Sequence, residues 1–256
     1  MLVGPTEPSF FDNPTAAVVF PDVPAENYRR VLDFGCGCGR IARQLIQQRP
    51  RPEHYRGIDL HRGMIDWCQR NLAPAAPGFE FAHHDVHNIS FNPQGSAKTL
   101  PLPADAGSVD LLLSWSVFTH LVELQAEFYL DEVARVLSPR GIAITTWFLF
   151  EKVDFPMMQD FQNCLFINDI DPTNATIFDR DWLRAGLRRR GLTPYRVIPP
   201  TLRGYQWQVW LTPSRSGAVD AEFPADLARV GRMAPPLLPE SADVSRLGFA
   251  PEDDKT

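Results

Sequence analysis

Residues 30–40 have the sequence RVLDFGCGCGR, a short apolar strand that runs into a turn with a glycine at every second position. We expect the strand at Arg30–Phe34, the turn at Gly35–Gly39 and a helix over about Arg40–Gln48. Glycines let the backbone approach a ligand closely, and the helix N-terminus points N–H groups at it. This order favours a ligand-binding turn over a tight turn without a ligand. The spacing GxGxG disfavours a nicotinamide dinucleotide, whose fingerprint is GxGxxG.

Strands and helices continue to alternate beyond this turn. The stretch VDLLLS at 109–114 is apolar without alternation, as expected of a strand that helices cover on both faces. The other expected strands span 55–60, 79–82 and 141–147, and the expected helices span 64–72 and 121–137. The alternation predicts an α/β fold with a doubly wound, mostly parallel, Rossmann-like sheet.

The alternation stops after Trp147. Residues 148–178 mix aromatic, Asn, Asp and Pro residues, and we interpret them as a cap insertion. A helix is expected at 182–190, with Asp179 or Asp181 as its N-cap, followed by an antiparallel pair of strands at 192–197 and 205–211. The sheet would then have seven strands. The predicted organisation is an N-terminal arm (1–27), one domain (28–212) and a C-terminal tail (213–256).

Polar residues stand at the ends of three predicted strands. Asp59 can accept both hydroxyls of a ribose, although it could also cap the following helix. Asp85 can accept from an adenine amino group while Val86 packs against the ring. Ser114 ends the fourth strand, next to the point where open α/β sheets bind ligands.

These features in this order resemble the class I S-adenosylmethionine-dependent methyltransferases. The segments that carry the resemblance are VLDFGCGCGR (31–40), GIDLHRGMIDWC (57–68), HHDV (83–86), SVDLLLSWSVFTHL (108–121) and EVARVLSPRGIAITTW (132–147). The resemblance implies S-adenosyl-L-methionine as cofactor. Its methionine part would be held by Asp33, Gly35, Gly37 and Gly39, its ribose by Asp59, its adenine by Asp85 and Val86. Leu60 and Met64 would line the ring and Ser114 the sulfonium. The WSVFTHL segment looks like a branch that methylates oxygen, including on sugars.

His120 is the candidate catalytic residue. It lies six residues after Ser114, and a histidine near the reacting methyl could take the proton from an alcohol during attack. The alternative is a histidine that only orders the start of the next helix. His83, His84 and His87 surround Asp85, and we favour loop and surface roles for them over metal ligation. Oxygen-rich residues of the cap could hold Mg²⁺ but more often form turns, so no metal site is predicted.

The composition is that of an ordinary globular protein, with 44% hydrophobic residues and a net charge of −6 among 256 residues. The negative charge argues against a nucleic-acid partner. No apolar run is long enough to predict a membrane span, and the four cysteines lack metal-ligand spacing, so we expect a cytoplasmic enzyme. The leading hypothesis is O-methylation of a small molecule or carbohydrate acceptor. N- or C-methylation, or cofactor binding without transfer, remain alternatives, and the oligomeric state is not predicted.

Overall fold

The computed structural model describes residues 10–200 and 205–224. Five parallel strands form the centre of the sheet in the order β3-β2-β1-β4-β5. Their bounds are Arg30–Phe34 (β1), His54–Asp59 (β2), Phe79–His83 (β3), Val109–Ser114 (β4) and Leu137–Phe150 (β5). Strand β9 (Trp207–Pro213) then pairs antiparallel with β5, and β8 (Leu192–Ile198) pairs antiparallel with β9. The predicted seven-stranded, mostly parallel sheet is therefore confirmed.

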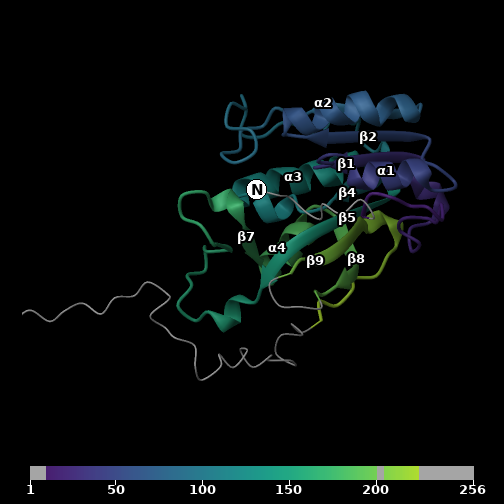
Figure 1. The fold of residues 1–256 in the computed structure, drawn as a ribbon. Coiled ribbons are helices and arrows are strands. Elements are labelled where there is room, and N and C mark those ends of the chain that lie inside the picture. The colour runs from purple at the N-terminus through teal and green to yellow at the C-terminus, as the bar shows by residue number, and fades with distance from the viewer. Residues whose placement is uncertain (1–9, 201–204, 225–256) are drawn as a thin grey trace, which may run out of the picture.

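Helices cover both faces of this sheet (Figure 1). They are α1 (Arg40–Gln47), α2 (Arg62–Asn71), α3 (Glu123–Val136) and α4 (Arg180–Arg189). Side chains alternate along β1 between two cores: Val31 packs with residues of α1 and α2, whereas Leu32 and Phe34 pack with residues of α3 and α4. The period of two in a strand thus divides the buried residues into two layers, as the doubly wound prediction requires.

The predicted cap is partly sheet. Strand β5 continues to Phe150, and its last residues pair in parallel with β7 (Thr176–Asp179), which pairs in turn with β6 (Cys164–Phe166). Residues 148–150, 164–166 and 176–178 therefore lie in strands, and the rest of the segment 151–175 lies outside the sheet. The aromatic residues that hid the periodicity are partly buried in this extension, since Phe178 is fully buried against Trp147 and Trp182.

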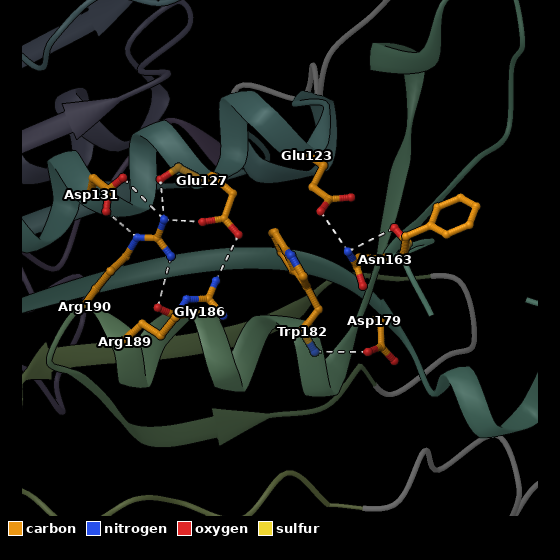
Figure 2. Close-up of polar contacts among 10 residues, drawn as sticks. Glu123, Glu127, Asp131, Asn163, Asp179, Trp182, Gly186, Arg189 and Arg190 are labelled. Atoms are coloured by element: carbon orange, nitrogen blue, oxygen red, sulfur yellow. Dashed lines mark hydrogen bonds and ion pairs between the residues drawn. The ribbon is translucent and has the colours of Figure 1, made fainter. Parts of the chain in front are cut away.

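Ion pairs hold α3 and α4 together (Figure 2). Arg190, whose side chain is 10% exposed, pairs with Glu127 and with Asp131, and Arg189 also reaches Glu127. Asp179, one of the two predicted caps, accepts a hydrogen bond from the Trp182 N–H at 3.0 Å and so begins α4. These contacts fix the helix layer next to the segment 151–175.

The N-terminal arm is described from Phe10 onward, and the tail to Pro224; residues 1–9 and 225–256 of these predicted segments lie outside the described residues. The arm packs along α1, where Asp12 pairs with Arg43 and the Asn13 N–H donates to Gln47. Within the described part of the chain, no helix is long and apolar enough to cross a membrane.

Candidate active site

A cavity opens where β1, β2 and β4 end, at the edge of the sheet that collects the carboxyl ends of parallel strands. The glycine turn forms its floor through Gly35 and Gly37. Leu60 and Met64 follow β2 on one side, and residues 115–117 follow β4 on another. The predicted strand ends therefore do converge on one site, as expected for an open α/β sheet.

The three glycines of the turn all have a positive φ, in the region that favours glycine. A Cβ on Gly35 would lie 2.3 Å from the Cγ2 of Val117, and one on Gly39 would lie 2.4 Å from the Cδ1 of Leu72. At Gly37 the nearest such neighbour is the Met64 sulfur at 3.9 Å. Gly35 and Gly39 are thus required by backbone conformation and packing. Gly37 is the one of the three that leaves room on the cavity side.

Asp59 lines the cavity at the end of β2. Its carboxylate accepts from the Gly37 N–H at 2.8 Å and from the His61 N–H at 2.7 Å. Desolvation raises the pKa of this carboxyl above its usual value, although both N–H donors act in the opposite direction. A carboxylate has about four acceptor positions. Two remain for hydroxyl donors from a ligand.

Asp33 lies behind the turn and is not among the residues that line the cavity. It is 1% exposed, and the Tyr55 hydroxyl donates to it at 2.7 Å. Burial raises the pKa of Asp33 to about 7, and the nearby charge of Asp59 adds to the increase. The structure gives Asp33 a supporting position beneath the glycine turn.

This carboxyl makes the stability of the fold depend on pH. The pKa of Asp33 rises from 3.8 to about 7 on folding. The contribution of this carboxyl to the free energy of unfolding is therefore fully present below pH 3.8 and is lost as the pH rises through 7. Asp33→Asn cannot ionise. Between about pH 4 and 8, the free energy of unfolding of the parent should therefore fall by roughly 2–4 kcal/mol relative to that of the variant. Urea denaturation at a series of pH values measures both curves, and parallel curves would contradict the assignment.

Asp85 does not line the cavity in this structure, and its adenine role stays a prediction. Its carboxylate accepts from Ser96 at 2.8 Å and from Asn92 at 3.2 Å, and these hydrogen bonds lower its pKa. The loop after β3 folds back and supplies both donors. The neighbours His84 and Val86 line the cavity instead.

Ser114 is also outside the cavity lining, because it is fully buried at the end of β4. Its hydroxyl has no hydrogen-bond partner among the described residues. Ser116 lines the cavity with a φ of +59°, and its N–H donates to the Thr146 hydroxyl at 2.7 Å. The chain thus turns sharply two residues after the strand, and a non-glycine residue at positive φ is often found at functional sites.

His120 lines the same cavity, in a short 3-10 turn (Phe118–His120) that precedes α3. The helix begins at Glu123 and not at Leu121, because Leu121 and Val122 have extended backbone conformations. The Nδ1 of His120 lies 2.9 Å from the carbonyl oxygen of Thr173. A carbonyl only accepts, so this contact places the proton of a neutral ring on Nδ1 and leaves Nε2 as an acceptor.

Sequence reasoning missed the residues that surround His120 and the buried histidine of the site. Phe91 packs edge-on against the His120 ring, with ring centroids 5.9 Å apart. His84 lies 2.9 Å from the Tyr129 hydroxyl, and burial lowers its pKa to about 4, so its ring is neutral near pH 7. Thr173 is 53 residues from His120 in the chain, and no local sequence pattern predicts that contact.

Within the described residues, no group of three or more His, Cys, Asp or Glu side chains could hold a metal ion.

Comparison with known proteins finds similarity over part of the chain. Residues 31–141 match the family model described as a methyltransferase domain. The matched segment runs from β1 to the start of β5 and contains the glycine turn, Asp59 and His120. The match covers less than half of the chain, and over this segment the sequence is similar to a methyltransferase domain.

Among characterised relatives, a fatty-acid O-methyltransferase of Mycolicibacterium smegmatis is 34% identical over 118 residues, which are 46% of this chain and 36% of that protein. Phthiotriol/phenolphthiotriol dimycocerosates methyltransferase 1 of Mycobacterium ulcerans is 32% identical over 120 residues, 46% of this chain and 37% of that protein. The chain thus spans about a third of the length of the relatives it matches. Among solved structures, the chain is similar to an S-adenosylmethionine-dependent methyltransferase from Clostridium acetobutylicum, with 12% identity and a TM-score of 0.50. The alignment covers 73% of this chain and 86% of that protein, and at this identity it shows the fold alone.

Proposed function

We propose that this protein is an S-adenosylmethionine-dependent O-methyltransferase whose cofactor and acceptor meet in the cavity above the glycine turn. The observation that carries the proposal is that Asp59 and His120 line the same cavity, Asp59 at the end of β2 and His120 after β4. The Asp59 carboxylate has free positions for hydrogen bonds from ribose hydroxyls. The Nε2 of His120 is free beside the place where the methyl acceptor would react.

The residues present fit the cofactor. Gly37 leaves space where the methionine part would approach the backbone, and Asp59 would receive the ribose hydroxyls. Leu60, Met64 and Val86 would supply apolar walls for the adenine. Asp33, Gly35 and Gly39 would act by shaping the turn. Asp85 and Ser114 would have to change their present contacts to touch the cofactor.

S-adenosylmethionine, when bound, supplies a methyl group on a sulfonium sulfur. The protein's part is to hold an acceptor oxygen in line with that methyl group and to receive its proton. His120 would accept the proton at Nε2, because its Nδ1 is occupied by the Thr173 carbonyl. Alignment of the two reactants supplies most of the acceleration in such a transfer, and a positioned base adds to it.

For the acceptor we favour a small molecule with an apolar body. Phe91, Trp115, Val117 and Leu121 line the part of the cavity around His120. The two relatives are named for fatty-acid and phthiotriol-type substrates. None of these comparisons supports the carbohydrate acceptor that the sequence suggested.

Two measurements test this function. Calorimetry should show binding of S-adenosylmethionine and no binding of NAD, and failure to bind S-adenosylmethionine would contradict the cofactor assignment. Incubation with fatty acids, apolar alcohols, amines and sugars should then form S-adenosylhomocysteine with an oxygen acceptor. Turnover confined to the amines would refute O-methylation.

A further inference from the structure

The segment 151–175 reaches into the site through one main-chain atom. The carbonyl oxygen of Thr173 is the partner of His120 Nδ1. This carbonyl belongs to a short 3-10 turn (Pro172–Asn174), which can present it in a fixed direction only if the turn itself is held. What holds the turn therefore also holds the imidazole ring.

Asp171 is the residue that holds it. Its side chain caps the turn by accepting from the Thr173 N–H at 3.1 Å, and it also accepts from the Thr173 hydroxyl. The Ser90 hydroxyl donates to its other oxygen at 2.6 Å. Asp171 is 7% exposed, and although burial raises its pKa, the hydrogen bonds from Ser90 and Thr173 keep it below the usual value. It is therefore an ionised carboxylate with three donors.

The same contacts tie the turn to the other wall of His120. The Asn88 amide donates to the Thr173 hydroxyl at 3.0 Å, and its oxygen accepts from the N–H of Phe91 at 2.9 Å. Phe91 is the ring that packs edge-on against His120. One connected set of hydrogen bonds thus fixes both the partner of Nδ1 and the aromatic neighbour of the ring.

The segment is also anchored on the side away from the cavity. Asn163 donates to Glu123, the first residue of α3, at 2.8 Å (Figure 2). Lys152 contacts the Asn163 side chain, and the Lys152 N–H donates to Asp179 at the start of α4. Anchored in this way, the segment can serve as a rigid support for the turn at 172–174.

We propose that Asp171 is a positioning residue for His120: by holding the Thr173 turn against the Ser90–Phe91 loop, it fixes the Nδ1-protonated tautomer and the orientation of the ring. The proposal rests on the proposed function, in which His120 Nε2 receives the proton. Asp171 lies outside the cavity lining, and its hydrogen bonds reach His120 through Thr173 and the loop. Nothing in the local sequence around His120 reveals this support.

The tautomer is the first test, because it does not require activity. Long-range ¹H–¹⁵N correlation spectra of the ¹⁵N-histidine-labelled protein, recorded where imidazole is neutral, report which nitrogen of His120 carries the proton. The signal is assigned by its loss in His120→Gln. We expect the Nδ1–H form in the parent and in the control Asp169→Ala, which alters an exposed carboxylate of the same segment. We expect a mixture of both tautomers in Asp171→Ala.

If Asp171→Ala does not fold, Thr173→Val takes its place, since it removes only the hydroxyl that joins Asp171 to Asn88. Thr173→Val is expected to give the same mixture of His120 tautomers, with a smaller share of the Nε2–H form. A pure Nδ1–H form in a folded Asp171→Ala or Thr173→Val protein would overturn the proposal.

A double-mutant cycle on turnover is the second test. Asp171→Ala should lower kcat by about 10–100-fold, as loss of an outer partner of a functional histidine typically does. In the His120→Gln background the same substitution should change kcat little, because the group that it positions is gone. Equal losses in both backgrounds would overturn the positioning role. If no acceptor is methylated at all, the proposed function fails, and the spectra still decide whether Asp171 sets the tautomer.

Discussion

Replacing His120 with glutamine is expected to lower kcat by about 10²–10⁴-fold while the Kd for S-adenosylmethionine stays nearly unchanged. Glutamine can keep a hydrogen bond to the Thr173 carbonyl through its amide, and so preserve the turn. It has no basic nitrogen to place where Nε2 stands. The loss should therefore fall on the step in which the acceptor gives up its proton, and the acidic limb of the pH–rate profile should disappear.

The rival explanation is that His120 only orders the turn between β4 and α3. Glutamine would then restore most of the activity and leave the pH profile unchanged. His54→Gln, at the opposite end of β2 from Asp59, controls for general effects of replacing a histidine. Full turnover of His120→Gln would refute the base and leave alignment of the reactants as the main source of rate.

The sheet could be predicted because its strands carry the information locally. Strands β1 and β4 have the predicted bounds, since both are short, apolar and bounded by turn formers or charge. Their convergence followed from topology, because parallel strands place their carboxyl ends at one edge. This is why the sequence alone predicts that Gly37, Asp59, Leu60 and His120 lie together.

Loops decide the geometry at two places that the sequence patterns do not describe. Asp85 lies two residues after the end of β3, and its side chain is held by Asn92 and Ser96 in a loop with no periodic pattern. The helix after β4 was predicted to begin at Leu121, but it begins at Glu123. The chain turns before it at Ser116, and a serine in the sequence does not indicate a positive φ. Side-chain periodicity reports which face is buried and does not report such backbone turns.

The contact between His120 and Thr173 could not have been predicted at all. The two residues belong to segments that meet only because β7 pairs with the end of β5 and brings the preceding turn back to the cavity. The sequence patterns led us to interpret the whole of 148–178 as a cap insertion. In the structure its last turn contacts the His120 ring through the Thr173 carbonyl. A functional histidine found by position can thus depend on partners that only tertiary structure reveals.

Asp59→Ala is expected to weaken S-adenosylmethionine binding by about 5- to 150-fold, the equivalent of roughly 1–3 kcal/mol. The carboxylate would receive the ribose hydroxyls, and it already accepts from the N–H groups of Gly37 and His61. Alanine removes the acceptor from all four donors, so the ligand loses its partners and the glycine turn loses its brace. Asp59→Asn keeps one acceptor oxygen and should fall between the parent and Asp59→Ala.

Calorimetry on the three proteins measures this order directly. Asp66→Ala serves as the matched control, because Asp66 is an exposed carboxylate on α2 and should leave the affinity unchanged. Thermal unfolding of the ligand-free proteins separates the two losses. If Asp59 only braces the turn, the Tm and the affinity for S-adenosylmethionine should fall together. Adenosine carries the ribose without the methionine, and its affinity should then show the same relative loss in all variants. Parental affinity in Asp59→Ala would refute the ribose assignment, because no other side chain of the cavity wall offers a carboxylate at the end of β2.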